Sequence, residues 1–126
     1  MPKSKFKILV IEDDPTQGLM YELALSSAGF EVTLADTGQK GLDAVKKVKP
    51  DLVFLDMILG DMQGIDILKK IRADKQTANL KVAVLSNLNK KELVDECKTL
   101  GVIDFIIKMQ FLPKDIVAKA KQFVIQ

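Results

Sequence analysis

Polar side chains that could bind a metal ion and a phosphoryl group follow several apolar runs of the sequence. Glu12 and Asp13 follow the run FKILVI, Asp56 follows LVFL, Ser86 follows VAVL and Lys108 follows FII. Carboxylates suit a hard divalent cation, while an ammonium and a hydroxyl can contact phosphoryl oxygens. Burying an ionised acid such as Asp56 is costly unless its charge is compensated. The hypothesis is that Mg²⁺ and Lys108 compensate it.

Five strand-length apolar runs are predicted to position these side chains. They span Phe6–Ile11, Val32–Ala35, Leu52–Leu55, Val82–Leu85 and Phe105–Ile107. The runs are rich in Val, Ile, Leu and Phe and mostly lack apolar/polar alternation, which indicates parallel strands covered on both faces. The carboxyl ends of parallel strands lie along one edge, where open α/β proteins bind ligands. We therefore expect the polar residues to converge at that edge.

Segments with helical spacing lie between and after the strands. They span about Pro15–Ala28, Thr37–Lys47, Gly64–Ala73, Lys90–Leu100 and Pro113–Val124. Asp14 is interpreted as the N-cap of the first helix rather than as a metal ligand. The core face of that helix is predicted to be Leu19, Met20, Leu23 and Ala24. The alternation of strand and helix predicts one doubly wound α/β domain over residues 1–126.

Composition argues against some classes of function. Of the 126 residues, 48 % are hydrophobic, and 19 basic and 17 acidic side chains give a formal net charge of +2. This balance is far from the strongly basic one that phosphate-backbone binding usually needs, so direct nucleic-acid binding is not expected. The amino-terminal segment MPKSKFKILV is read as neither a secretion signal nor a membrane span. Cys97 is expected to be an inert core thiol, and a cytoplasmic location is predicted.

Four segments together resemble the receiver domain of two-component response regulators, the CheY-like family. They are ILVIEDDP, DLVFLDMILGDMQG, VAVLSN and DFIIK, in the order and at the spacings typical of that family. The match covers nearly the whole chain. The resemblance implies a flavodoxin-like, CheY-like three-layer sandwich with a parallel five-stranded sheet in the order 2-1-3-4-5.

The resemblance also implies roles for the residues that handle phosphate. Asp56 would be the phospho-acceptor, and Ser86 and Lys108 would hold the phosphoryl oxygens. Phe105 matches the family's switch aromatic and would move inward as Ser86 turns toward the phosphoryl group. The surface formed by the fourth helix, the last strand and the last helix would then change.

A magnesium site is implied by the same resemblance. Asp13 and Asp56 would bind Mg²⁺ directly, and Ile58 would supply its main-chain carbonyl. Glu12 would reach the ion through water. No other cofactor is expected.

The implied function is phosphoryl transfer in a phosphorelay. A histidine kinase or phosphotransfer protein would supply the phosphoryl group, and an unidentified downstream protein would bind the switched surface. The same surface could pair with another copy of the chain. The chain would catalyse only its own phosphorylation and dephosphorylation, so it is not otherwise expected to be an enzyme, and no membrane partner is expected.

Three residues depart from the family pattern, the first being Gly60, which stands where a proline usually follows the phospho-acceptor segment. Met109 stands where the family usually has a proline joined to the lysine by a cis bond, and a cis bond to a non-proline residue costs on the order of 3 kcal/mol. A trans bond here could displace Lys108. Asn87 is larger than the small residue common at its position. The alternative function is therefore a degenerate receiver that serves as an interaction module without phospho-switching.

Apolar neighbours of the acceptor bear on how long a phosphoryl group would last. Ile58 and Leu88 flank the expected path of a hydrolytic water, and neither side chain can hydrogen-bond it. Slow loss of phosphate is therefore predicted.

Two rival functions fit the loop after the first strand less well. A haloacid-dehalogenase-type enzyme would carry a D-x-D motif there, where this chain has Glu12, Asp13 and Asp14. A flavin or nucleotide binder would need a glycine- or hydroxyl-rich anion loop, whereas this loop is acidic.

Overall fold

The computed structural model describes residues 5–125, so the two ends of the predicted domain, including the start of the segment MPKSKFKILV, lie outside the described residues. The strands are β1 (Lys7–Ile11), β2 (Glu31–Ala35), β3 (Leu52–Leu55), β4 (Val82–Ser86) and β5 (Asp104–Ile107). The helices are α1 (Pro15–Ser27), α2 (Gly38–Val48), α3 (Gly64–Ala73), α4 (Lys91–Thr99) and α5 (Pro113–Val124), with a short 3₁₀ helix η1 (Lys108–Gln110) after β5. Over this range, no helix combines the length and apolar character that crossing a membrane requires.

The strands form one parallel sheet in the order β2-β1-β3-β4-β5, which confirms the predicted fold class and strand order. Ile11, the last residue of β1, pairs with Ala35 and with Leu55. Ser86 pairs with Ile107 at the end of β4 and β5. The register therefore aligns the carboxyl ends, and the residues that follow them emerge along one edge.

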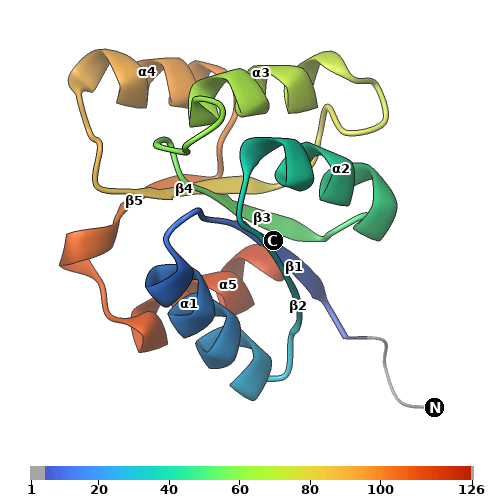
Figure 1. Ribbon diagram of the computed structural model, residues 1–126, viewed down its shortest axis with the longest axis vertical. Helices are drawn as coiled ribbons and strands as arrows, with labels where there is room; N and C mark the ends of the chain where they lie inside the picture. Colours follow the sequence, from blue (N-terminus) through green and yellow to red (C-terminus); the bar gives the residue numbers. More distant parts are fainter. Residues whose placement is uncertain (1–4, 126) are drawn as a thin grey trace.

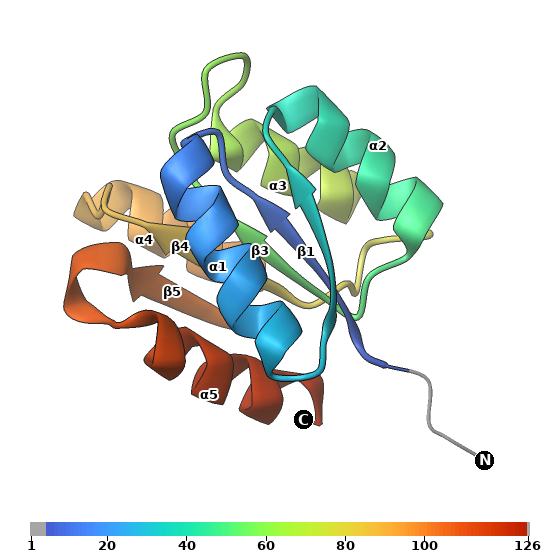
Figure 2. The same cartoon turned by 60° about the horizontal axis from the view of Figure 1, so that its bottom comes forward.

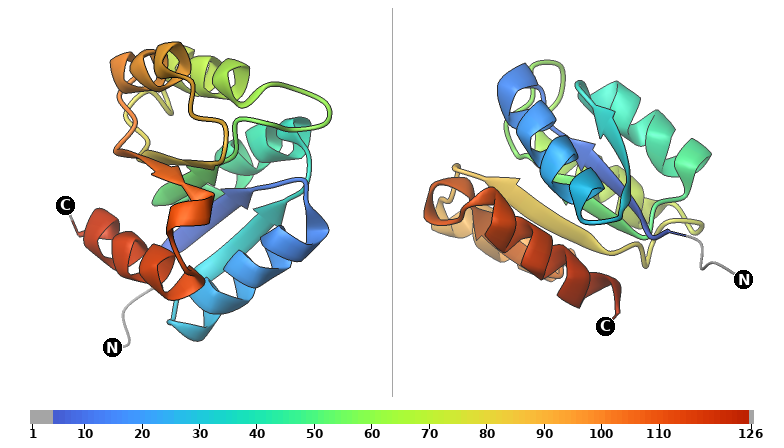
Figure 3. Two further views of the ribbon diagram at one scale, coloured as in Figure 1. Left: turned by 90° about the vertical axis from the view of Figure 1, so that its left-hand side faces the viewer. Right: turned by 90° about the horizontal axis from the view of Figure 1, so that it is seen from below.

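Helices cover both faces of the sheet, as the uninterrupted apolar strands predict. Figure 1 shows α3 and α4 on one side of the sheet and α1 and α5 on the other, and Figure 2 brings α1 and α5 to the front. The side view in Figure 3 shows the same three layers edge-on. Along β1, Leu9 and Ile11 enter the core on the side of α2, α3 and α4, while Ile8 and Val10 enter the core on the side of α1 and α5.

Helix α1 begins at the predicted cap. The Asp14 carboxylate accepts the N–H groups of Thr16 and Gln17 at 2.9 and 3.2 Å, and Pro15 occupies the first turn. This satisfies donors that have no partner within the helix. The cap thereby fixes the acidic loop relative to the first turn of α1.

The predicted core face of α1 is wrong. Leu19, Met20 and Leu23 are 51 %, 38 % and 57 % exposed, and Ala24 is only partly buried. The residues that α1 buries are Gly18, Tyr21 and Leu25. Apolar side chains surround much of this helix, so their spacing alone does not select a face. At Gly18 the helix packs directly against β2, since a Cβ there would lie 3.0 Å from the Leu34 side chain.

A partly buried guanidinium connects two loops at the amino-terminal edge of the sheet. Arg72, at the end of α3, donates hydrogen bonds to the carbonyls of Ala78 and Leu80 at 3.0 and 2.7 Å. It also donates to the carbonyls of Leu100 and Gly101 at 2.6 and 3.2 Å. One side chain thus satisfies main-chain oxygens of the α3–β4 loop and of the α4–β5 turn.

Candidate functional site

Asp56 lies at the centre of the carboxyl edge and is 6 % exposed. Its Oδ1 accepts the Ser86 hydroxyl at 2.7 Å and the Ile58 N–H at 3.1 Å. Its Oδ2 accepts the Lys108 ammonium at 2.7 Å. Both carboxylate oxygens therefore have donors, and the lysine supplies part of the charge compensation that burial requires.

Glu12 is the second carboxylate that Lys108 contacts. It is 3 % exposed, and it accepts hydrogen bonds from the Lys108 ammonium and, at 3.1 Å, from the Asp14 N–H. Burial raises the pKa of Glu12, against the opposing effect of these two hydrogen bonds. Burial alone would lower the pKa of Lys108, but its hydrogen bonds with Asp56 and Glu12 outweigh this and raise it. The ammonium is therefore held in its charged form between the two acids.

Three carboxylates of this edge could share one metal ion. Glu12, Asp13 and Asp56 each offer an oxygen, and these oxygens lie within 4.8 Å of one another, with Asp13 exposed to solvent. When all are ionised, three negative charges against the one positive charge of Lys108 leave a surplus of two, which a divalent cation would balance. Carboxylate oxygens are the ligands that Mg²⁺ prefers. The donor set thus fits a hard divalent ion.

Two further predicted residues lie nearby. Phe105 is partly buried and packs against the core cluster beneath α3 and α4, and it pairs with Val84 in the sheet. Ile58 has an exposed side chain, 58 % accessible, and forms an isolated bridge with Gln63. The switch role of Phe105 and the metal-ligand role of the Ile58 carbonyl stay predictions.

The bond between Lys108 and Met109 is trans, since no peptide bond within residues 5–125 is cis. The sequence suggested that a trans bond could displace Lys108, but the ammonium still reaches Asp56 and Glu12. The Met109 N–H, a group that proline lacks, donates to Asn87 Oδ1 at 2.9 Å.

Gly64 is a residue of this site that the sequence analysis did not single out. A Cβ at this position would lie 2.2 Å from the main-chain oxygen of Asp56 and 2.6 Å from the Cα of Met57. The Gly64 N–H instead donates to the Met57 carbonyl at 2.9 Å. Glycine thus allows α3 to start directly against the acceptor segment. In the sequence, only its place at the predicted start of a helix could have indicated that Gly64 has a structural role here.

Asp61 was also missed. Its carboxylate accepts the N–H groups of Gly38 and Gln39 at 2.7 and 3.0 Å, so it ties the β3–α3 loop to the start of α2. These hydrogen bonds lower the pKa of Asp61. No local pattern of the sequence connects positions so far apart.

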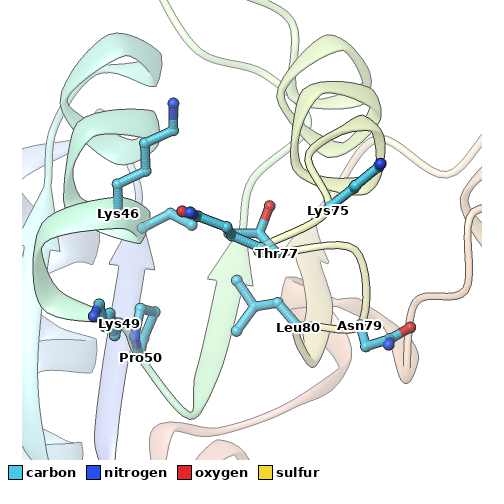
Figure 4. A pocket seen from close by; sticks show the side chains of 9 residues that line it. Lys46, Lys49, Pro50, Lys75, Thr77, Asn79 and Leu80 are labelled. Carbon is cyan, nitrogen blue, oxygen red and sulfur yellow. The ribbon is translucent and has the colours of Figure 1, made fainter.

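A hollow of about 510 Å³ lies at the amino-terminal edge of the sheet, opposite the edge that carries Asp56. It lies between the end of α2 and the α3–β4 loop, and its lining includes Lys46, Lys49 and Lys75. Figure 4 shows the three ammonium groups at separate places around the hollow rather than converging on one point. Lys46 instead lies 3.8 Å from an oxygen of Asp74. The hollow therefore lacks the convergent charges of the carboxyl edge.

Comparison with known sequences identifies relatives over most of this chain. A family model described as the response regulator receiver domain matches residues 8–121. The DNA-binding response regulator MtrA of Mycolicibacterium smegmatis is 34 % identical over 123 residues, covering 96 % of this chain and 51 % of the relative. The cell cycle transcriptional regulator CtrA of Caulobacter vibrioides is 38 % identical over 104 residues, covering 81 % of this chain and 43 % of the relative. The chain thus spans about half the length of these curated relatives.

Solved structures share the fold. A CheY-like response regulator receiver domain protein from Methanospirillum hungatei superposes with a TM-score of 0.89 at 26 % identity, covering 96 % of this chain and 94 % of that one. The chemotaxis protein CheY4 of Vibrio cholerae superposes with a TM-score of 0.87 at 23 % identity, covering 95 % of this chain and 99 % of that one. The second likeness shows the fold alone.

Proposed function

The chain belongs to the response regulator receiver domain family, and from that premise we propose that it accepts a phosphoryl group on Asp56 in a two-component signalling system. One observation carries the proposal. A single buried carboxylate receives a hydroxyl from Ser86 on one oxygen and an ammonium from Lys108 on the other. These are the two kinds of donor that a transferred phosphoryl group needs beside its acceptor.

The donor of the phosphoryl group would be a phosphohistidine on a histidine kinase or phosphotransfer protein. An oxygen of Asp56 attacks phosphorus in line, so an O–P bond forms while the N–P bond to histidine breaks and its electron pair returns to the imidazole. Lys108 compensates the charge on the equatorial oxygens, and Ser86 turns its hydroxyl toward one of them. Positioning and electrostatics supply most of the acceleration.

Magnesium is the cofactor that the acidic cluster would bind. Asp13 and Asp56 would be direct ligands, with the Ile58 carbonyl as a third and Glu12 acting through water. When bound, Mg²⁺ would screen the repulsion between the attacking carboxylate and the anionic phosphoryl group. The surplus of negative charge around Lys108 supports this assignment.

The signal would leave through the surface formed by α4, β5 and α5. Phe105 lies in β5 and would move inward as Ser86 turns, which changes this surface for a downstream protein or for a second copy of the chain. Direct nucleic-acid binding is not proposed for this chain, although two relatives are named as DNA-binding or transcriptional regulators. Its only enzymatic activity would be its own phosphorylation and dephosphorylation, in the cytoplasm.

Intact mass after incubation with phosphoramidate and Mg²⁺ tests the acceptor. Addition of one phosphoryl group is expected in the wild type and not in Asp56→Asn. Asp66→Asn, which changes an exposed acid in the first turn of α3, is the matched control and is expected to be phosphorylated like the wild type.

The competing function is an interaction module without phospho-switching, for which the replacement of the usual proline by Met109 is the relevant observation. Absence of added mass in the wild type, or added mass that persists in Asp56→Asn, would favour this module over the phospho-acceptor.

A further inference from the structure

A side-chain hydrogen bond joins the two segments that leave the sheet beside Asp56. Asn87 Oδ1 accepts the main-chain N–H of Met109 at 2.9 Å, although the residues are 22 positions apart. The last pair of β4 and β5 is Ser86 with Ile107, so the bond lies just beyond the end of the strand ladder. Both segments leave the same edge of the sheet (Figure 1). The bond therefore continues the connection between the two strands by one further contact.

Each joined residue directly follows a side chain that holds Asp56. Ser86 precedes Asn87 and donates to Oδ1 of Asp56 at 2.7 Å. Lys108 precedes Met109 and donates to Oδ2 at 2.7 Å. The bond between Asn87 and Met109 thus closes a ring of contacts that runs from one oxygen of the acceptor to the other.

The Met109 side chain itself does little to hold the turn after β5. The Met109 side chain is 77 % exposed, so it adds little packing. The internal bond of η1, from the Phe111 N–H to the Lys108 carbonyl, is 3.2 Å long. The Lys108 ammonium contacts Asp56 and Glu12, and the path of the main chain at Lys108 sets where the stem of that side chain begins. A bond that holds the next peptide group restricts that position.

We propose that Asn87 is a positioning residue for phosphoryl transfer, which holds the Met109 N–H and so fixes the turn that directs Lys108 at Asp56. The proposal rests on the proposed function of Asp56 as acceptor. Proline at position 109 would have no N–H to donate. Asn87 and a non-proline residue at position 109 are therefore a matched pair, and these two of the departures from the family pattern have one physical explanation.

Phosphorylation kinetics of the whole chain test the positioning role. Asn87→Ala removes the acceptor and is expected to slow phosphorylation by phosphoramidate, at saturating Mg²⁺, by roughly three- to tenfold, as for loss of one ordinary hydrogen bond. Asn89→Ala makes the same change two positions along the same exposed loop and is expected to match the wild type. Urea denaturation of each variant verifies that the fold is retained.

Hydrogen exchange at the Met109 amide, followed by NMR, tests the bond itself. The amide is expected to be protected in the wild type and to exchange about tenfold faster in Asn87→Ala. Asn87→Asp keeps an acceptor oxygen at the same position and is expected to restore protection, which a general loosening of the loop would not do.

The outcomes separate this proposal from the proposed function. Equal phosphorylation rates in wild type and Asn87→Ala, or equal exchange at Met109, would overturn the positioning role while leaving Asp56 as the acceptor. A wild type that takes up no phosphoryl group although its Met109 amide is protected would overturn the proposed function, and the positioning role with it.

Discussion

Lysines at the two edges of the sheet have very different surroundings. At the carboxyl edge, the Lys108 side chain is 10 % exposed and contacts Glu12 and Asp56, which are themselves buried. At the amino-terminal edge, Lys46 is 69 % exposed and lies 3.8 Å from an oxygen of Asp74. Exposed ion pairs contribute little, whereas removing one member of a buried pair leaves an uncompensated charge. Convergence and burial of charge, rather than the volume of a hollow, therefore distinguish the edge that can do chemistry.

The largest expected difference between the edges is in reactivity. Lys108→Met should slow phosphorylation by phosphoramidate by about a hundredfold or more, because it removes the cation aimed at the transferred oxygens. Lys75→Met, at the hollow of the opposite edge, should leave the rate unchanged. Intact mass measured on samples quenched at successive times gives the phosphorylation rate of both variants. Equal rates for the two would contradict a special role of Lys108 at the carboxyl edge.

The effect of Mg²⁺ on the stability of the fold should also differ between variants at the two edges. Free Mg²⁺ at a hundred times its dissociation constant should stabilise the wild type by about 2.7 kcal/mol, because the ion binds only the folded acidic cluster. Asp13→Asn removes a proposed ligand and should lose most of this effect, whereas Asp74→Asn at the other edge should keep it. Thermal melts across a Mg²⁺ series measure the difference. A wild-type melting temperature that ignores Mg²⁺ would contradict the site.

Dephosphorylation tests the apolar surroundings of the acceptor. Ile58→Asn with Leu88→Gln introduces groups that can hydrogen-bond water, so phosphate loss should become roughly fivefold faster for each hydrogen bond gained. Gln76→Ala at the hollow is the control and should retain the wild-type decay. The half-life of the phosphorylated protein is the measurement, and decay in the wild type as fast as in the double variant would remove the idea of water exclusion.

Alkaline pH should produce the smallest effect. Because the folded-state pKa of Lys108 is raised above 10.5, its ion pairs stabilise the fold fully below pH 10.5, and this contribution is lost as pH rises through the folded-state pKa. As pH rises through this range, the free energy of unfolding of the wild type should therefore fall more than that of Lys108→Met. The free energy of unfolding of Lys75→Met should fall as much as that of the wild type. Urea denaturation without Mg²⁺ checks the slopes, and parallel declines in wild type and Lys108→Met would contradict the expectation.

The sequence was sufficient to predict the positions of residues that the strand order and strand direction alone determine. Strand β3 was predicted at its observed bounds, Leu52–Leu55. Once the sheet is parallel, the residues after its strands must share an edge. The proximity of Asp56, Ser86 and Lys108 follows from that geometry and needs no knowledge of side-chain packing.

Features that depend on how segments approach one another could not be predicted. Apolar residues surround α1, so the face that includes Leu19 and Leu23 was assigned to the core although both are exposed. The bond from Met109 to Asn87 depends on the paths of two turns after their strands end. The contact of Asp61 with the start of α2 likewise joins segments whose distance the sequence does not encode locally.

The guanidinium of Arg72 has a consequence for how the molecule opens. It holds carbonyls of the α3–β4 loop, at Ala78 and Leu80, and of the α4–β5 turn, at Leu100 and Gly101. Separate N–H groups of the same guanidinium bond the two segments, so when either one detaches, Arg72 loses half of the contacts that hold it in place for the other. These two stretches, distant in sequence, should therefore unfold locally as one cooperative unit, and a protease that cuts one should find the other accessible at the same moment.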